Sequence, residues 1–396
     1  MTYQEIEKMY TRIFSENELQ EIRHQIHMYP ELGGEEFHTD EVICSSLEKW
    51  GIPYKKGLAG TGVAVRFTGK RPGKTVALRA DIDALPVQEE TGLPFSSKVP
   101  GKMHACGHDI HTTVLIGIAR MLKELDGEYA GNFTLIFQPA EERQGGAKPM
   151  IEAGVLEDPH ADCCLALHCG ADIDAGYTGI RYDSMFAASD AIDIKITGKS
   201  SHAAYPSLGV DPIVIAAQII STIQSVISRN TAPQNSAVVT IGKISGGTVR
   251  NQIPDTVEMQ GTIRTLDPET REFTVKRVED ICRGIAESMG GKAEFTRKAG
   301  YPPLVNDNSI VDVMKQVMTE GIGAENVHIL KAPVMGAEDF AYFTQERPSA
   351  LWRLGCRHKG AETVPLHNSK FDPDESCIDL GVKLQTAIAL RLAGNE

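Results

Sequence analysis

The sequence contains no apolar run of the roughly 20 residues that a membrane-spanning helix requires, and its most apolar stretch, 213–227, is broken by polar residues at helical spacing. It also lacks a basic patch, and a net charge of −13 disfavours nucleic acid or an anionic membrane as a partner. The first residues have neither the basic start nor the apolar run of a signal peptide. Low-complexity tracts and internal repeats are absent as well. We therefore expect a globular, cytoplasmic protein.

The bulk composition predicts two domains with ordinary cores. A chain of 396 residues exceeds the roughly 100–200 residues of a typical domain. Hydrophobic residues at 41% and charged residues at 23% are enough to fill cores and keep the surface polar. The eight cysteines are scattered, and in a reducing compartment they are expected to be buried thiols or metal ligands rather than disulfides.

The first part of the chain alternates helices and strands. A capping box at Ser15 to Glu18 and apolar residues at helical spacing predict a helix that Pro30 ends. Further helices are predicted at 39–50 and 111–125, and strands at 61–67, 75–82, 132–137 and 161–167. This order is typical of an α/β domain with helices packed on a mixed, mostly parallel sheet.

From about residue 184 the pattern changes to strict alternation, as in a sheet with one solvated face. Asp211-Pro212 and Asp267-Pro268 each begin a helix, and strands are predicted at 236–244, 256–265 and 292–296. The resulting β-α-β-β-α-β order is the ferredoxin-like α+β unit. We therefore expect a catalytic domain at 1–184 and 299–396 that carries an inserted lid domain at 185–298.

Residues able to bind a metal follow several predicted strands. His104-Ala105-Cys106-Gly107-His108-Asp109 combines a thiol and imidazoles that could share one side of an extended segment. Asp81-Ile82-Asp83, Gln138-Pro139-Ala140-Glu141-Glu142 and His168 each come at a strand end, and His367 lies in an irregular segment. If the sheet is parallel, the groups at strand ends converge on one edge.

This set is too large for one tetrahedral zinc. Three imidazoles, one carboxylate and the Cys106 thiolate could instead hold two ions roughly 3.5–4 Å apart, with the sulfur as the bridge. The competing interpretation explains each residue separately, because buried cysteines are common and paired glutamates are usually solvated. The recurrence of such residues at strand ends favours the metal site.

Adjacent carboxylates suit metal-assisted amide hydrolysis. One must bind metal while the other takes a proton from the water that the cations acidify. We assign Glu142 to the metal and Glu141 to the proton, which Glu141 can then return to the leaving amine.

Two residues of the predicted lid domain could contact substrate. His202 could donate to the developing oxyanion, although a surface histidine explains it equally well. Arg264 could pair with a substrate carboxylate, although an exposed arginine on a strand is the commoner explanation.

Taken together, these motifs resemble the aminoacylase, hippurate hydrolase and indole-acetyl-amino-acid hydrolase branch of the co-catalytic, two-metal metallopeptidases. The resemblance spans nearly the whole chain. It implies a catalytic α/β domain with a dimerising lid and two divalent ions per subunit. Manganese or zinc is the expected metal, with cobalt or nickel as alternatives. The segments that carry it are Arg79 to Pro86, His104 to Asp109, Gln138 to Glu142, Lys199 to His202 with Pro206, Asn251 to Asp255, and Gly336 to Asp339.

The resemblance also implies roles for individual residues. The base falls on Glu141, and Asp83 corresponds to a residue that orients a ligand. His202 and Asn251 resemble lid residues that reach the partner subunit's active site, so a homodimer or higher homo-oligomer is implied. Arg264 and Glu338 join Asn251 as candidate substrate-binding residues. The metal ligands fall on Cys106, His108, Glu142, His168 and His367.

The chain departs from the peptidase relatives at two positions. They have His-x-Asp where this chain has Asp81-Ile82-Asp83, and a bridging aspartate where it has Cys106. Both departures point to the acyl-amino-acid branch, and they leave the role of Asp81 open. In this pattern His104 and His111 are not ligands.

The sequence thus predicts an amidohydrolase that cleaves N-acetyl, N-benzoyl or similar N-acyl amino acids to a carboxylic acid and a free amino acid. A dipeptidase or carboxypeptidase with the same site is the second hypothesis. A binding protein that has lost turnover is the third, and the presence of every candidate ligand and both glutamates disfavours it. The acyl group, the amino acid and the metal are left open.

Overall fold

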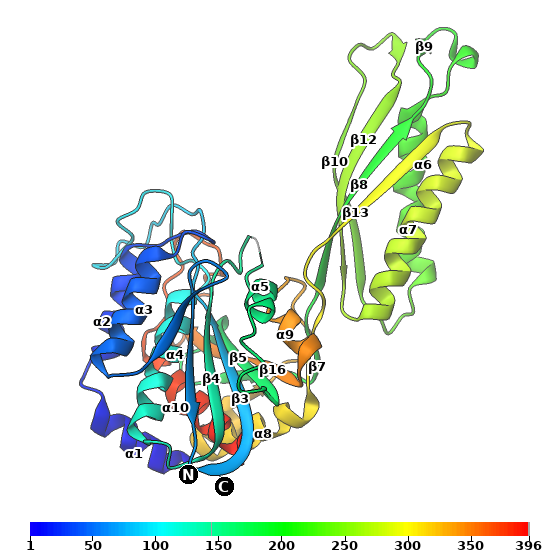
Figure 1. The fold of residues 1–396 in the computed structure, drawn as a ribbon. Coiled ribbons are helices and arrows are strands. Elements are labelled where there is room, and N and C mark those ends of the chain that lie inside the picture. The colour runs from blue at the N-terminus through cyan, green and yellow to red at the C-terminus, as the bar shows by residue number, and fades with distance from the viewer. Residues whose placement is uncertain (144, 395–396) are drawn as a thin grey trace. The chain divides into compact units, whose positions relative to one another are not determined.

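The structure is a computed structural model that describes residues 1–143 and 145–394. The chain divides into two compact units, and each is described by itself (Figure 1). The first comprises Met1–Asp183, Val305–Ala332 and Tyr342–Glu396, and the second comprises Ser184–Leu304 and Pro333–Ala341. The second unit thus takes in residues 299–304 and Pro333–Ala341, which lie beyond the predicted boundary at 298.

A mixed sheet forms the middle of the first unit. Among the described residues its strands run in the order β1-β2-β4-β3-β5-β16-β6-β15. β3 is parallel to β4 and β5, and β5 is parallel to β16, whereas β1, β2 and β4 pair antiparallel. The predicted α/β fold with a mostly parallel sheet is therefore confirmed. The strands are β1 (Tyr54–Leu58), β2 (Gly62–Thr68), β3 (Arg71–Asp81), β4 (Ala130–Gln138), β5 (Cys163–Asp174), β6 (Thr178–Ile180), β15 (Val327–Ile329) and β16 (Ser349–Arg357).

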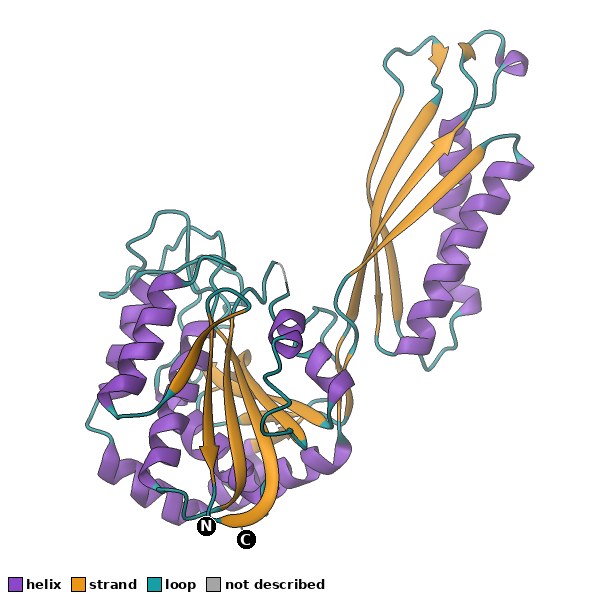
Figure 2. Cartoon of the chain, viewed as in Figure 1, coloured by secondary structure: helices purple, strands orange, loops and turns teal. Residues whose placement is uncertain are grey.

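Helices cover this sheet (Figure 2). α4 (His108–Glu124) and α10 (Ser376–Leu392) pack against each other and against the central strands. Most residues of α4, β4 and β5 are buried, which explains why their sequences read as nearly continuous apolar runs. The remaining helices of this part are α1 (Tyr3–Ile13), α2 (Glu18–Met28), α3 (Phe37–Lys49), α5 (Ala147–Glu152), α8 (Asn308–Ile322), the short 3-10 turn η3 (Ala324–Asn326) and α9 (Ala341–Glu346).

The N-terminal helix α1 was not predicted. It has a complete capping box in which Thr2 accepts from the Glu5 backbone and Glu5 accepts from the Thr2 backbone. The capping box predicted at Ser15 does not form as expected. α2 begins after Asn17, which has φ 64° and makes no side-chain cap, and Glu18 reaches back to the Ser15 amide over 3.4 Å.

The second unit has the predicted ferredoxin-like order. β8 (Ala188–Thr197), α6 (Pro212–Ser225), β10 (Ala237–Gly246), β12 (Thr256–Thr265), α7 (Pro268–Ser288) and β13 (Lys292–Ala299) follow one another in the chain. The strands pair antiparallel in the order β10-β12-β8-β13. Ile192, Ile194 and Ile196 are all buried in the core of this unit, as their alternation predicts.

α6 begins as the sequence predicts, because the Asp211 side chain accepts from the amides of Ile213 and Val214 and Pro212 occupies the first turn. Together with the π-helical turn η2 (Val226–Asn230) it forms the one described helix that is long and apolar enough, by length and composition only, to cross a membrane. Its inner residues Ile215, Ile219 and Ile223 are buried in the core of the second unit.

Short elements complete the chain. β9 (Ser201–His202) pairs with β11 (Gln252–Ile253), and β7 (Asp183–Phe186) pairs with β14 (Leu304–Asn306). A 3-10 turn, η1 (Pro206–Leu208), follows β9.

Candidate metal centre

Two parallel strands end side by side and begin the site. β3 and β4 are paired up to Asp81 and Gln138, and the Ile82 amide donates to the Gln138 carbonyl over 3.0 Å. Asp83 and Glu141 therefore follow neighbouring strands at the same edge of the sheet. This is the convergence that the sequence predicts.

A turn, rather than an extended segment, presents Cys106 and His108. Gly107 has φ 90°, and His108 is the first residue of α4. A Cβ at Gly107 would lie 2.7 Å from Cys169 Sγ, so glycine is needed both for the backbone conformation and for the close contact. The expectation that His104, Cys106 and His108 could share one side of an extended segment is wrong, because this turn separates them.

His168 also lies differently from the prediction. β5 continues to Asp174, so His168 is inside the strand instead of at its end. Its Nε2 lies 3.5 Å from Cys106 Sγ, and its Nδ1 donates to the Cys169 carbonyl over 2.9 Å.

His367 lies on a loop and has φ 65°, a strained conformation for a residue with a side chain. Its amide donates to the Ala105 carbonyl over 2.8 Å, which ties the loop to the Cys106 turn. Its Nε2 lies 3.2 Å from Glu142 Oε1.

All five predicted ligands meet around one sulfur atom. Among the described residues, five groups have candidate ligand atoms within 4.8 Å of one another, and two of these groups share Cys106. The first group adds His108 and His168, and the second adds Glu142 and His367. Glu141 lies within the same distance of His108 and Glu142. The geometry therefore offers two adjacent positions for ions.

Buried polar atoms fit this interpretation. His108 donates from Nδ1 to the Asp83 carbonyl over 2.9 Å, so that in the neutral ring the lone pair is on Nε2. That Nε2 is buried and has no hydrogen-bond partner among the described residues. An imidazole held in this way by a carbonyl is the usual arrangement of a metal-bound histidine. A set of sulfur, nitrogen and oxygen donors suits manganese, zinc, cobalt or nickel.

Burial and neighbouring charges together control the protonation of the candidate ligands. Burial lowers the pKa of His168 well below its usual value, so this ring is neutral and able to bind a cation. It raises the pKa of the Cys106 thiol well above its usual value. Burial would also raise the pKa of Glu142, but the hydrogen bond with His367 and the charge of His108 lower it. Binding of an ion must therefore displace the Cys106 proton.

Asp83 contacts both halves of the site. Its Oδ1 accepts the Glu141 amide and its Oδ2 accepts the Glu142 amide, each over 3.0 Å. Its backbone carbonyl accepts from His108. One buried residue therefore holds the glutamate pair and a candidate ligand together.

Asp81, whose role the sequence leaves open, contacts a second histidine of α4. Its carboxylate accepts from His111 Nδ1 over 2.6 Å and from Arg79 over 2.7 Å. His111 Nε2 in turn accepts the Cys169 amide over 2.8 Å, and the Cys169 carbonyl holds His168. Burial would raise the pKa of Asp81, but the charges of His108 and Arg79 hold it well below its usual value.

Sequence reasoning missed this connection from Asp81 to His168. One signal was present, because His111 lies three residues after His108 and so shares a face of α4.

The second unit contains the predicted lid residues His202, Asn251 and Arg264, and also Glu338, which was expected in the catalytic domain. His202 is exposed on β9, where its Nδ1 accepts the Ala204 amide over 3.1 Å. Asn251 is exposed just before β11, and Arg264 is half-buried on β12. Glu338 is buried, and its Oε1 accepts the Phe340 amide over 2.9 Å.

His104 does not join the candidate ligands. Its ring centroid lies 6.3 Å from that of His27, and both of its ring nitrogens are buried without a hydrogen-bond partner in the described chain. Burial lowers the pKa of His104 to about 3, which keeps the ring neutral.

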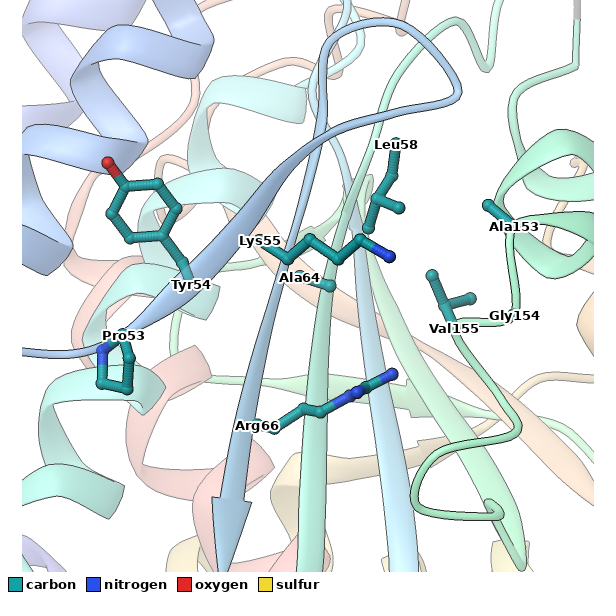
Figure 3. Close-up of a pocket in the computed structure, with 9 residues that line it drawn as sticks. All are labelled: Pro53, Tyr54, Lys55, Leu58, Ala64, Arg66, Ala153, Gly154 and Val155. Carbon is teal, nitrogen blue, oxygen red and sulfur yellow. The ribbon is translucent and has the colours of Figure 1, made fainter.

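A pocket of about 180 Å³ lies elsewhere in the first unit, at the β1 edge of the sheet (Figure 3). Lys55 and Arg66 are its charged lining residues, and Arg66 is paired with Asp158 over 3.2 Å. None of the predicted site residues lines it.

Comparison with known proteins places the chain in a family. The model of the peptidase family M20/M25/M40 matches residues 77–391. Among solved structures, the Bacillus subtilis YXEP protein, a dinuclear metal-binding peptidase of family M20, superposes with a TM-score of 0.84 at 33% identity and covers 98% of this chain and 99% of its own.

Several curated proteins are similar over nearly the full length. N-acetyl-L-cysteine deacetylase of Bacillus subtilis is 42% identical, covering 92% of this chain and 85% of that protein. IAA-amino acid hydrolase ILR1-like 4 of Arabidopsis thaliana is 40% identical, with 93% and 84% covered. Thermostable carboxypeptidase 1 of Saccharolobus solfataricus is 38% identical, with 94% and 95% covered. Matches of this extent and identity, on a chain with this arrangement of candidate ligands, show that it belongs to the peptidase family M20/M25/M40.

Proposed function

We propose that this protein is a metal-dependent amidohydrolase that hydrolyses the amide bond of N-acyl amino acids to a carboxylic acid and a free amino acid. The observation that carries the proposal is the pair of ligand groups that share Cys106 beside Glu141. Similarity to a deacetylase and to an amino acid conjugate hydrolase supports this substrate class.

The cofactor in this proposal is a pair of divalent ions. His108 and His168 with Cys106 would hold one ion, and Glu142 and His367 with Cys106 would hold the other. The mixed donor set favours manganese or zinc, with cobalt and nickel as alternatives. When bound, such ions polarise the amide carbonyl and lower the pKa of the attacking water.

Glu141 is the general base in this proposal. It is buried beside the candidate ligands, and Asp83 fixes its backbone. Its carboxylate takes the proton from the attacking water and delivers it to the amine that leaves, so that one residue serves both steps. His202 is proposed to stabilise the developing oxyanion, and Asn251, Arg264 and Glu338 to bind the substrate.

A dipeptidase or carboxypeptidase that uses the same ligands is the second candidate, favoured by the similarity to a carboxypeptidase. A substrate panel separates the two. Metal-stripped enzyme is supplied with manganese, zinc, cobalt or nickel and assayed against N-acetyl and N-benzoyl amino acids and dipeptides. Faster turnover of the N-acyl amino acids is expected. Turnover of dipeptides alone would overturn the proposed substrate class, and no turnover with any metal would favour a binding protein.

We further propose a homodimer formed through the second unit. Ile213 and Val214 on α6 are each 46% exposed, and Val238 and Ile244 on the edge strand β10 are 43% and 52% exposed. An edge strand and a helix with exposed apolar residues are a common self-association surface. Light scattering after size-exclusion chromatography is expected to give twice the chain mass.

We propose a cytoplasmic location because of the state of the cysteines. Each of the eight is a free, buried thiol, as expected of a protein in a reducing compartment.

A further inference from the structure

The peptide just before the proposed base has an unfavourable conformation. Ala140 has φ 57°, in the left-handed region that side chains disfavour. It directly precedes Glu141 and Glu142, so its conformation sets the direction in which both carboxylates leave the backbone. Such a conformation persists only where surrounding contacts hold it. The Gly145 and Gly146 amides donate to the Ala140 carbonyl within the loop.

Glu36 holds the Ala140 amide from a distant segment. Its side chain is fully buried, and Oε1 accepts the Ala140 amide over 2.8 Å. Oε2 accepts the Thr61 hydroxyl over 2.6 Å, which fixes the carboxylate itself. The segment is also packed closely on the loop, because a Cβ at Gly33 would lie 2.9 Å from Ala140 Cα.

Three successive amides are held in the same way. The Ala140 amide donates to Glu36, and the Glu141 and Glu142 amides donate to the two oxygens of Asp83. Charged acceptors make strong, directional bonds with backbone amides. Without Glu36, Asp83 would still hold the Glu141 and Glu142 amides, but the Ala140 amide would lose its carboxylate acceptor.

We propose that Glu36 is a positioning residue for the glutamate pair: it holds the Ala140 peptide and thereby aims Glu141 at the attacking water and Glu142 at the metal. The proposal rests on the proposed function for the part that concerns Glu141. For Glu142 it concerns metal binding alone, which can be measured without a substrate.

The test compares Glu36→Ala with Glu36→Gln. Alanine removes the acceptor, and we expect about a 10- to 100-fold loss of manganese or zinc affinity, measured by competition with a chelator, and a similar fall in kcat with KM little changed. Glutamine keeps an oxygen for the Ala140 amide and should retain most of the affinity. Wild-type metal affinity and kcat in Glu36→Ala would overturn the proposal.

Glu31 provides a matched control in the same segment. Its carboxylate accepts the amides of His38 and Thr39, each over 3.0 Å, and so caps α3 without touching Ala140. Glu31→Ala should lower Tm while metal affinity and kcat stay unchanged. An equal loss of metal affinity in Glu31→Ala and Glu36→Ala would mean that both act through stability, which contradicts positioning.

Thr61→Val is the second variant should Glu36→Ala fail to fold. It removes only the hydroxyl that anchors Glu36 and is expected to lower metal affinity in the same direction. Unchanged metal affinity in folded Thr61→Val would then count against the proposal. If wild-type enzyme binds metal but hydrolyses no N-acyl amino acid, the proposed function fails while the affinity comparison still decides the role of Glu36.

Discussion

At the scale of single residues, Glu141 and Glu142 are neighbours with different surroundings. The Glu142 carboxylate lies beside His367 in one candidate ligand group, whereas Glu141 is proposed to carry the proton. In Glu141→Gln we expect the metal content and Tm to be kept while kcat falls at least about a hundredfold, because the general base is lost. Steady-state kinetics and elemental analysis measure both properties, and unchanged turnover would exclude the mechanism.

Cys106 is the only described residue common to both candidate ligand groups. Cys106→Ala should therefore lose metal from both positions, as shown by elemental analysis after dialysis. Cys164→Ala is the matched control, because Cys164 is equally a buried thiol but lies on β5 away from these groups. Metal retained in full by Cys106→Ala would show that the sulfur is not a ligand.

Protonation of His104 makes the free energy of unfolding depend on pH. Its pKa is about 3 in the folded state, against about 6.5 in an unfolded chain, so between these two pH values the proton binds mainly to the unfolded chain. Stability is therefore lost as pH falls from about 6.5 toward 3. The free energy of unfolding of wild type should fall by about 2 kcal/mol more between pH 7 and pH 5 than that of His104→Gln. Urea unfolding measures the difference, and equal pH dependence would refute it.

At the scale of secondary-structure elements, α4 and β5 are joined through His111. This side chain runs from Asp81 to the Cys169 amide, next to the candidate ligand His168. His111→Ala should weaken metal binding about tenfold, because the Cys169 peptide that orients His168 loses its support. Chelator competition measures the affinity. Thr113 lies on the same helix, and its hydroxyl donates to the Asp109 carbonyl, so Thr113→Val should bind metal as wild type does. Equal losses in both variants would point to a general effect on α4.

The elements themselves could largely be predicted from periodicity. Alternating isoleucines revealed β8, and Asp-Pro pairs located the starts of α6 and α7, because these signals are local in the chain. The α/β fold and the ferredoxin-like order followed from the sequence of elements.

Other features could not be predicted because they depend on contacts between distant segments. The turn at Gly107 follows from its contact with Cys169, and the acceptor for the Ala140 amide comes from Glu36. No spacing in the sequence reveals such pairings. The position of His168 inside β5 was missed because the strand runs on to Asp174 through a glycine and two aspartates, which are uncommon in strands.

At the scale of the whole molecule, the proposed dimer makes a sharp prediction. If His202 acts in the partner subunit's site, His202→Ala and Glu141→Gln chains are each inactive, but a mixed dimer has one site that is intact in both residues. Mixing them should restore part of the activity, measured by steady-state rate after subunit exchange. Exchange confirmed by differently tagged chains without any recovery would contradict sharing between subunits.

The insertion of the second unit between His168 and His367 affects the order in which the protein matures on the ribosome. Chains are synthesised from the N-terminus at roughly 5–20 residues per second, so the Cys106, His108 and His168 group emerges well before the loop that carries His367. If these three residues hold an ion as proposed, a nascent chain could bind its first cation before His367 is synthesised. The second proposed ion site needs His367, whose amide donates to the Ala105 carbonyl, so translation would be nearly finished before both ions could be bound.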